Sequence, residues 1–324
     1  VVDLATTALT VTNATAQELS GVIPAMKNLK TVDITNPQAT GEELRQLRED
    51  YPNVTIRWSI QVGDRIVPET AEEVDLTGLK LTSTEEAARY ASCFPNITKL
   101  NLTDCGLDNE TMASIREDYP GTELVWRIQF GKYSAWTNAE TIRAVYNVFD
   151  DTCENLKYCW RTKYMDIGHN ETLTDLSFVG YMPDLEILIA SGCAVKQLDG
   201  FENCKKLEFL ELAYCYKLQS IDPLAGCENL RNLNICYSKV SDLHALDGLP
   251  LEQFMCKQTR VPADEQKIFK EIHPDCVTNF YGKEPYAGAG WRYKDNGKTY
   301  TEIYKKVREV FDYDDMPMPT VTKK

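Results

Sequence analysis

Histidine is the side chain best suited to acid–base catalysis near neutral pH, and the chain of 324 residues contains three, at positions 169, 244 and 273. None of them lies near a cysteine or serine motif of a known catalytic kind. His273 stands where two similar segments carry Tyr51 and Tyr119, so we interpret it as a packing residue. Catalytic groups must converge in one pocket, and no such convergence is visible in the sequence. We therefore predict a protein that is not an enzyme.

The eleven cysteines form no C-x-x-C pair, which argues against a zinc ribbon or a thioredoxin-type redox motif. A chain of this length does not need a disulfide framework, so we predict buried free thiols that act as small hydrophobic side chains. Cys153 and Cys159 are the pair that we regard as best placed for a disulfide. Cys236 falls on an outward strand position and is predicted to be exposed and reactive.

The chain is acidic, with a formal net charge of −14. This charge repels the phosphates of nucleic acids and of anionic membranes. No apolar run approaches the roughly 18 residues that a membrane helix needs. The acidic runs contain no D-x-D-x-D-G calcium loop. We therefore expect no nucleic-acid partner, no membrane insertion, no metal and no cofactor.

An internal repeat supplies the elements that would position functional side chains. Segments that begin at Leu185, Leu207, Leu230 and Leu251 read LEILIASGCAVKQL, LEFLELAYCYKLQSI, LRNLNICYSKVSDL and LEQFMCKQTRV. Their starts are 22, 23 and 21 residues apart, and a degenerate copy runs from 164 to 176. LxL alternation predicts a short strand with one buried face, and stacked copies predict a parallel sheet over a continuous core. The predicted buried set is Leu188, Leu210, Leu212, Leu233, Ile235 and Phe254.

A second, longer pattern relates REDYPNVTIRWSIQVG, from Arg48, to REDYPGTELVWRIQFG, from Arg116, at nine of sixteen positions. A weaker third copy lies at 254–280. Each long unit reads as strand, turn, helix, proline turn and strand, with helices that start after Thr40-x-x-Glu43 and Ser83-x-x-Glu86. The segments TIRWSIQVGDRIV and ELVWRIQFGKYSA are predicted to form strands or hairpins that leave the repeat.

Two further helices are predicted. ETIRAVYNVF follows Thr137-x-x-Glu140 and lies in the interruption at 134–160. YTEIYKKVREVF is amphipathic, and we expect it to cover the last open edge of the repeat array.

The short copies fit LxxLxLxxN/CxL and resemble the leucine-rich-repeat family, with internalin-like short repeats. The long units resemble ribonuclease-inhibitor-type repeats. The chain as a whole is similar to secreted or surface leucine-rich-repeat proteins of Gram-positive bacteria. The resemblance implies an α/β right-handed solenoid with a parallel concave sheet, convex helices and short turns, and a C-terminal helical cap. The family position after the strand, usually Asn and sometimes Cys, is held by Asn170, Cys193, Cys215 and Ser238.

We divide the chain into four parts. Residues 1–133 form long units with hairpin extensions, and 134–160 form an irregular helical connection. Residues 161–281 form the short array with its final long-type unit, and 282–324 form the cap and a mobile tail.

Alternate strand residues should point outward onto the concave face. This candidate binding stripe consists of Tyr164, Asp166, Ile187, Ile189, Phe209, Glu211, Asn232, Asn234, Gln253, Met255 and Lys257. Tyr214, Tyr216 and Tyr237 flank it in the following turns, and tyrosine is favoured at interfaces. The alternative is that these residues only cover the sheet, or that the hairpins pack over them.

Three functions remain open. The first is a monomeric, non-catalytic interaction module of a secreted or cell-surface bacterial protein, which binds a protein or another surface macromolecule. Because the chain begins Val1-Val2-Asp3, we expect a mature fragment from which a signal peptide has been removed. The alternatives are an architectural spacer of a larger surface protein, and an enzyme with a site in 125–160 or 282–300.

Overall fold

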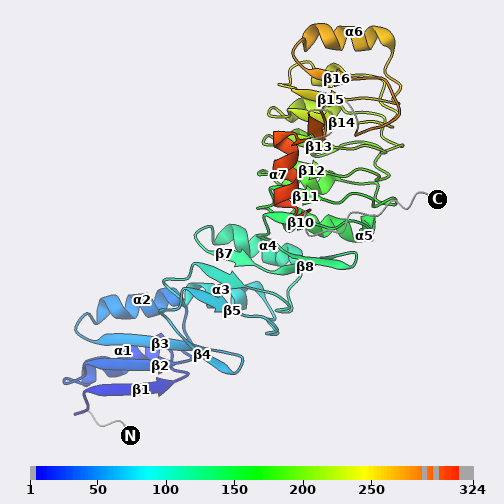
Figure 1. Cartoon of the computed structure of the whole chain (residues 1–324). Helices are drawn as coiled ribbons and strands as arrows, with labels where there is room; N and C mark the ends of the chain where they lie inside the picture. The colour runs from blue at the N-terminus through cyan, green and yellow to red at the C-terminus, as the bar shows by residue number, and fades with distance from the viewer. Residues whose placement is uncertain (1–4, 287–289, 295–298, 314–324) are drawn as a thin grey trace. The chain divides into compact units, whose positions relative to one another are not determined.

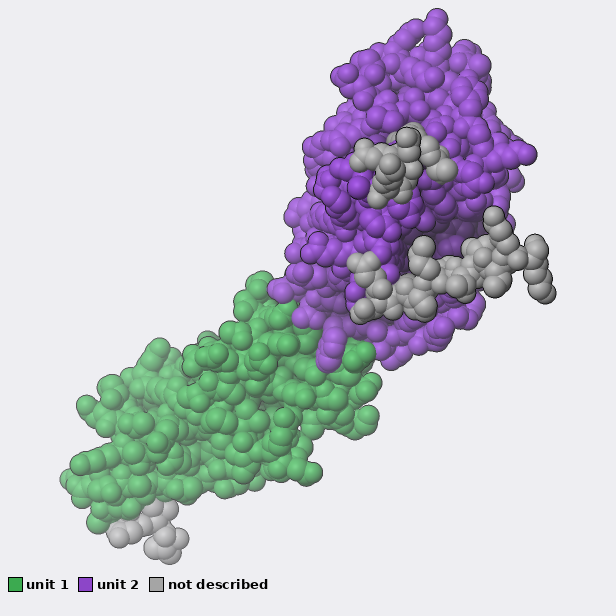
Figure 2. Space-filling model, viewed as in Figure 1, with its two compact units in different colours: residues 1–127 green, residues 128–324 purple. Residues whose placement is uncertain are grey.

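A computed structural model describes residues 5–286, 290–294 and 299–313. The chain forms two compact units, residues 1–127 and 128–324 (Figures 1 and 2). In the part of the chain that the structure describes, no helix combines the length and the apolar character needed to cross a bilayer. The four-part division of the chain stays a prediction.

Unit 1 alternates strands with helices, as the long pattern predicts. Strands β1, β2 and β3 pair in parallel, β3 and β4 form an antiparallel hairpin, and β5, β6 and β7 form a second parallel sheet. The strands are β1 Ala8–Thr12, β2 Thr31–Thr35, β3 Thr55–Val62, β4 Arg65–Pro68, β5 Glu73–Asp75, β6 Lys99–Asn101 and β7 Glu123–Val125. The helices are α1 Ala16–Val22, η1 Ile23–Ala25, α2 Gly41–Asp50, α3 Thr84–Ser92 and α4 Asn109–Asp118.

The predicted helix starts in unit 1 are confirmed. The Thr40 backbone N–H donates to the Glu43 carboxylate at 2.7 Å, and the Glu43 N–H donates back to the Thr40 hydroxyl at 3.2 Å. Ser83 accepts from the Glu86 N–H at 3.3 Å. These bonds satisfy backbone donors that have no partner within the first helical turn.

Unit 2 is built on one parallel sheet of seven strands, in the order β10 to β16 (Figure 1). These strands are β10 Thr141–Arg143, β11 Tyr164–Asp166, β12 Ile187–Ile189, β13 Phe209–Glu211, β14 Asn232–Asn234, β15 Gln253–Met255 and β16 Val277–Asn279. The connections contain α5 Asp150–Cys153, η2 Glu154–Tyr158, η3 Ser177–Tyr181, η4 Phe201–Asn203, η5 Asp222–Gly226, η6 His244–Leu246 and α6 Ala263–Ile272. Two hairpins, β8 Arg127–Phe130 with β9 Tyr133–Trp136 and β17 Tyr293–Lys294 with β18 Thr299–Tyr300, and the helix α7 Glu302–Val310 complete it.

The strand register confirms the predicted core. Leu188 aligns with Leu210, Leu210 with Leu233, and Leu233 with Phe254, and all four side chains are fully buried. One short strand cannot bury its apolar face alone, so each repeat depends on its neighbours in the stack. The parallel ladder, the short repeats with 3₁₀ turns and the long units with helices together make an α/β leucine-rich-repeat solenoid.

Three of the four predicted turn positions donate to backbone carbonyls, whereas the hydroxyl at the fourth, Ser238, accepts the Val240 N–H at 3.4 Å. The Asn170 amide donates to the carbonyl oxygens of Ala144 and Ile167 at 3.0 and 2.7 Å. The thiols of Cys193 and Cys215 donate to the equivalent carbonyls of the preceding repeat, both at 3.4 Å. Cysteine can therefore replace asparagine at this turn position, because its thiol still supplies one weak hydrogen-bond donor.

The helix predicted over ETIRAVYNVF is wrong, because residues 141–143 form strand β10. Ile142 is buried and pairs with Met165. Pairing with the neighbouring strand therefore outweighs a local pattern that favours a helix. The C-terminal helix is confirmed as α7, but it packs on the concave face of the sheet rather than over its last strand. The tail that we expected to be mobile lies outside the described residues.

All eleven cysteines are buried free thiols, so Cys153 and Cys159 form no disulfide. The prediction that Cys236 is exposed is wrong, because its side chain is buried and its sulfur accepts the Lys257 N–H at 3.2 Å. Burial raises the pKa of the Cys193, Cys204 and Cys227 thiols to about 12.

We predict that a thiol reagent at pH 8 modifies none of the eleven cysteines of the folded chain within minutes and all of them after denaturation. The thiolate is the reactive species, and burial disfavours it until the pH approaches those raised pKa values. A colorimetric count with Ellman's reagent, with and without guanidinium, measures this. Rapid modification of one or more thiols in the folded protein would contradict the prediction.

Candidate functional site

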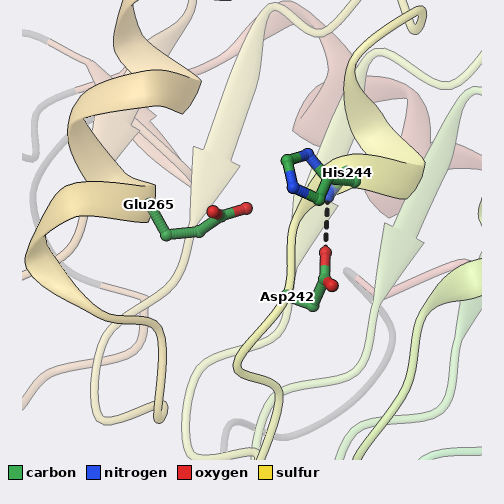
Figure 3. Close-up of side chains that lie close together, drawn as sticks. All are labelled: Asp242, His244 and Glu265. Atoms are coloured by element: carbon green, nitrogen blue, oxygen red, sulfur yellow. Dashed lines mark hydrogen bonds between the residues drawn. The ribbon is translucent and has the colours of Figure 1, made fainter.

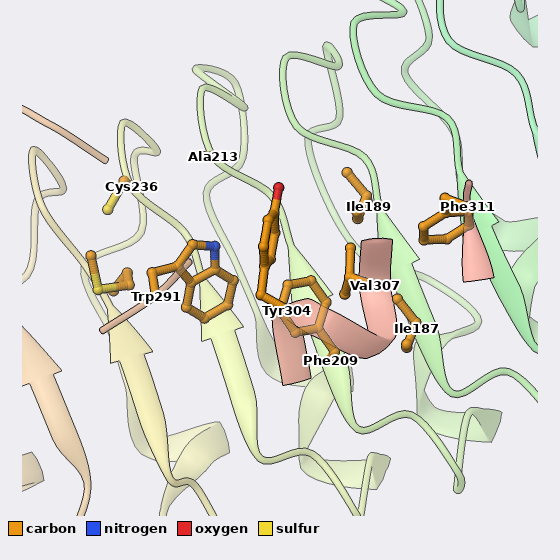
Figure 4. Packing of buried hydrophobic residues seen from close by; sticks show 10 residues of the cluster. Ile187, Ile189, Phe209, Ala213, Cys236, Trp291, Tyr304, Val307 and Phe311 are labelled. Atoms are coloured by element: carbon orange, nitrogen blue, oxygen red, sulfur yellow. The ribbon is translucent and has the colours of Figure 1, made fainter. Parts of the chain in front are cut away.

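The concave face of unit 2 is covered by the chain's own C-terminal segment, by which we mean the described residues of 282–313. Trp291 stacks on Phe209 with ring centroids 4.9 Å apart, and both side chains are fully buried. Tyr304, Val307 and Phe311 complete an apolar cluster with the concave side chains of β12 and β13 (Figure 4). The apolar concave residues are therefore matched by apolar residues from the same chain.

Glu211 is the polar centre of this contact, and only 1% of its surface is exposed. Its carboxylate accepts the indole N–H of Trp291 at 2.6 Å, the Ser191 hydroxyl at 3.1 Å and the Arg292 guanidinium at 3.3 Å. Burying a carboxylate is unfavourable unless it is paired and hydrogen-bonded. Two of these three donors come from the C-terminal segment.

Further polar contacts join the sheet to the C-terminal segment. Asn234 donates to the Pro285 carbonyl at 3.1 Å, Lys257 to the Glu284 carbonyl at 2.7 Å and Gln253 to the Gly290 carbonyl at 2.7 Å. The Tyr313 hydroxyl donates to Asp166 at 2.6 Å, and Lys306 pairs with Glu186 at 2.8 Å. Burial raises the pKa of Asp166.

The candidate binding stripe is therefore not open to solvent, contrary to our expectation. Nine of its residues are buried and two, Tyr164 and Gln253, are half-buried; the buried ones are Asp166, Ile187, Ile189, Phe209, Glu211, Asn232, Asn234, Met255 and Lys257. The alternative that these residues only cover the sheet stays open. The segment that packs over them is the C-terminal segment and not one of the predicted hairpins. That the stripe binds a partner stays a prediction, and it requires this segment to leave.

A row of aromatic residues lies in the turns that follow the strands, and we call Tyr146, His169, Tyr214 and Tyr237 the aromatic row. Each is the third residue after its strand, and each has a positive φ, between 58° and 66°. Tyr146 stacks with His169 at 5.3 Å and Tyr214 with Tyr237 at 4.9 Å, while Gly192 occupies the turn between the two pairs. Tyr216 contacts Tyr237 edge-on at 6.1 Å and is 58% exposed.

The backbone of the row is strained. A positive φ suits glycine and is tolerated by asparagine, aspartate and histidine, whereas in other residues such as tyrosine it costs roughly 1–2 kcal/mol. Turns of unit 1 with a positive φ hold the favoured types, at Asn13, Asn36 and Asp104. Unit 2 places bulky aromatic side chains in the same conformation.

A cavity of about 320 Å³ lies between the C-terminal segment and the turns after β10 to β12. It brings together Asp166, His169 and Ser191, a set of residue types that could form a catalytic triad. Ser191 instead donates to Glu211, and Asp166 accepts from Tyr313 and from the Gly168 N–H. Among the described residues, no hydrogen bond joins the His169 imidazole to Ser191 or Asp166.

One group in the described part of the chain, Asp242, His244 and Glu265, could present metal ligands, and its ligand atoms lie within 4.8 Å of one another (Figure 3). In the sequence, the only sign of this group is the short spacing between Asp242 and His244. Both carboxylates have structural partners, since Asp242 accepts the His244 N–H at 2.9 Å and Glu265 accepts the Leu243 N–H at 3.1 Å. Asp175 caps the equivalent turn of an earlier repeat through the Ser177 N–H at 2.7 Å. These carboxylates therefore cap backbone N–H groups in the turns of the repeats.

The residues that sequence reasoning missed lie in the C-terminal segment. Tyr286, Trp291 and Arg292 lie in a stretch rich in glycine and aromatics within the predicted C-terminal cap, and the sequence assigns them no contact with the sheet. Its aromatic content was the available signal, because large apolar rings seldom stay in water without a partner surface.

We predict that Phe209→Ala lowers the free energy of unfolding by about 3–5 kcal/mol, since it empties the site on which Trp291 stacks. Denaturant unfolding measures the loss, and limited proteolysis should show faster cleavage within 282–313. Tyr181→Ala, at an exposed aromatic on η3, is the matched control and should change stability by no more than about 0.5 kcal/mol. Equal stability of the two variants would show that the C-terminal segment is not docked on Phe209.

We predict a raised pKa for His244, chiefly because of the charge of Glu265, then through its hydrogen bond to Asp247 and the charge of Asp242. A raised folded-state pKa stabilises the fold below the unfolded value, and this contribution disappears as the pH rises through the folded value. An NMR titration of the imidazole measures it. Glu265→Gln should lower this pKa, whereas Glu271→Gln, on the same helix, should leave it unchanged; no response to Glu265→Gln would refute the assignment.

Comparisons with known proteins return leucine-rich-repeat structures and add nothing to the description of the repeats. No protein-family model and no curated protein sequence matches the chain. Among solved structures, it is similar to the internalin InlF of Listeria monocytogenes, with 14% identity and a TM-score of 0.42 over 83% of this chain and 81% of that one. A leucine-rich-repeat protein of Leptospira interrogans gives 15% and 0.37 over 80% and 74%, and internalin C2 of Listeria monocytogenes gives 18% and 0.29 over 46% and 74%. Likenesses this distant carry no argument about function, so the fold assignment, a leucine-rich-repeat solenoid with internalin-like short repeats, rests on the sheet and the repeat spacing of the chain itself.

Proposed function

We propose that this chain is a non-catalytic interaction module that binds a protein partner at the aromatic row of unit 2. The observation that carries the proposal is the positive φ of Tyr146, His169, Tyr214 and Tyr237. Strained residues persist where a function outweighs the stability that they forfeit, and replacement by asparagine or glycine would remove the strain.

The chemistry of the row fits an interface. Tyrosine offers a large apolar ring with a polar tip and few rotatable bonds, so it gains contact area at a low entropic cost. Tyr146 and Tyr216 are more than half exposed, and Tyr146 already stacks on His169 while Tyr216 contacts Tyr237 edge-on, so these rings need little further ordering. A partner surface with its own aromatic or arginine side chains would complete these stacks.

The row also takes the place of the concave stripe as the binding surface in this proposal. Phe209, Ile189 and Met255 are unavailable to a partner while Trp291 and α7 lie over them. The turns after the strands remain at the rim of that contact, where side chains such as Tyr216 reach solvent.

The cellular setting of this proposal is a secreted or cell-surface bacterial protein, which acts as a monomer. It rests on the resemblance of the short repeats to those of internalins. The net charge of −14 disfavours nucleic acid as the partner.

The test uses the intact chain with Tyr216→Asn and Tyr237→Asn combined. Tyr237→Asn relieves strain but also loses the stacking and the hydrogen bond from the Tyr237 hydroxyl to the Lys283 carbonyl at 2.8 Å, so the melting temperature of the double variant is measured first. Affinity for a rim partner should fall at least tenfold while the chain stays folded. Immobilised wild type, the double variant and Tyr181→Asn are each exposed to surface extracts, and captured proteins are compared by mass spectrometry. Tyr181 is 63% exposed and lies on η3, away from the row, so it controls for non-specific adhesion to tyrosine.

A protein that wild type and Tyr181→Asn retain but the double variant loses supports the proposal, and its dissociation constant is then measured with the purified pair. If the double variant retains the same proteins as wild type, or if wild type retains none, the proposal is wrong.

A further inference from the structure

The cavity beside the Tyr146 end of the aromatic row has the size of a small-ligand site. Its volume of about 320 Å³ lies at the lower end of the range typical of ligand pockets. The first three repeats and the C-terminal segment both line it, so it exists only while that segment is docked. Neither the interaction surface proposed above nor the repeat architecture requires such a cavity.

Aromatic rings form much of the wall. Tyr146 and His169 stack on the sheet side, and Tyr286, Tyr293 and Tyr304 come from the C-terminal segment. Val145 and Ile189 add apolar surface. A planar, apolar body would find rings to stack against from both sides.

The acids of the cavity are already in use. Asp166 and Glu211 are 4% and 1% exposed. Asp166 accepts two hydrogen bonds, from Tyr313 and Gly168, and Glu211 accepts three, all described above. Both carboxylates lie buried at the floor of the cavity, where protein donors already bond to them.

The arginines present donors instead. Arg292 lies with its guanidinium 3.8 Å from the Tyr286 ring centroid, and its buried Nε–H has no hydrogen-bond partner. Arg143 donates one N–H to the Phe311 carbonyl at 3.0 Å and lies over the Tyr313 ring, which fixes the plane of its remaining donors. Arg308 lines the cavity from α7. Arg292 is itself ion-paired with Glu211 at 3.3 Å. The cavity lining therefore holds three guanidiniums and two carboxylates, an excess of one positive charge.

We propose that this cavity binds a small carboxylate attached to a planar apolar body. The carboxylate accepts from the remaining N–H donors of Arg143 in the positive field of Arg292 and Arg308, and the body stacks between the Tyr146–His169 pair and the tyrosines of the C-terminal segment. Arginine is suited to this role because its planar fork matches the two oxygens of a carboxylate. The net charge of −14 repels anions at long range, but salt screens that repulsion beyond about 8 Å at physiological ionic strength, so direct contact decides binding.

The experiment titrates the ¹⁵N-labelled intact chain with phenylacetate, phenylacetamide and phenethylamine, which share a ring and differ in charge. The readout is the Nε–H cross-peak of Arg292 in the arginine side-chain region. Phenylacetate should shift this peak in a saturable way, and the amide should bind at least tenfold more weakly because it lacks the charged acceptor. A peptide that ends in a free phenylalanine carboxylate, compared with its amidated form, distinguishes a protein C-terminus from a free acid as the source of the group.

Arg143→Gln and Arg308→Gln should each weaken phenylacetate binding, by roughly tenfold for Arg143→Gln. Arg231→Gln is the matched control, because Arg231 pairs with Glu252 and does not line the cavity. Arg143 also holds the C-terminal segment, so the melting temperature of each variant is measured, and Arg308→Gln keeps the test valid if Arg143→Gln releases that segment.

Equal binding of acid and amide, preference for the amine, or unchanged affinity in both arginine variants would overturn the proposal. Tyr216 and Tyr237 do not line the cavity, so a failure here leaves the test of the aromatic row unaffected.

Discussion

The buried carboxylate of Glu211 is the constraint on which the rest of unit 2 depends. It lies in the middle of the sheet, on the concave face, and its charge is tolerated because Trp291, Arg292 and Ser191 all donate to it. Removing one partner from a buried, paired charge is far more destabilising than the net stabilisation that the pair itself provides. The C-terminal segment is therefore held in one position, where a purely apolar contact would permit sliding.

This docking decides where a partner or a ligand can bind. It removes the concave stripe from solvent, leaves the turns after the strands at the rim, and creates the cavity between the segment and the first repeats. The aromatic row and the arginine-lined cavity share Tyr146 and His169 but use different chemistry. The row is a series of stacked rings, with Tyr146 and His169 exposed and Tyr214 and Tyr237 half-buried, which we propose for a protein partner. The cavity is lined by arginines and aromatic rings, which we propose for a small anion.

Unit 2 differs from unit 1 in some of its turns of positive φ. Unit 1 holds asparagine, aspartate and glycine at such positions, whereas unit 2 also places Tyr146, His169, Tyr214, Tyr237 and Gln258 there. At two repeats of unit 2, cysteine takes the usual asparagine position and keeps a single weak donor. In our proposal the strained tyrosine turns mark a functional surface, because asparagine or glycine would favour folding more.

The sequence by itself determined the repeat, the strand register, the buried leucines, the helix caps of unit 1 and the free thiols, because each follows from local periodicity or from the identity of one side chain. It also located Tyr214, Tyr216 and Tyr237 in the turns. Only the tertiary structure decided that β10 joins the sheet and that Trp291 bonds to Glu211, which lies 80 residues earlier in the sequence. A contact between such distant segments depends on shape and on pairing of buried polar groups, and neither leaves a periodic trace in the sequence.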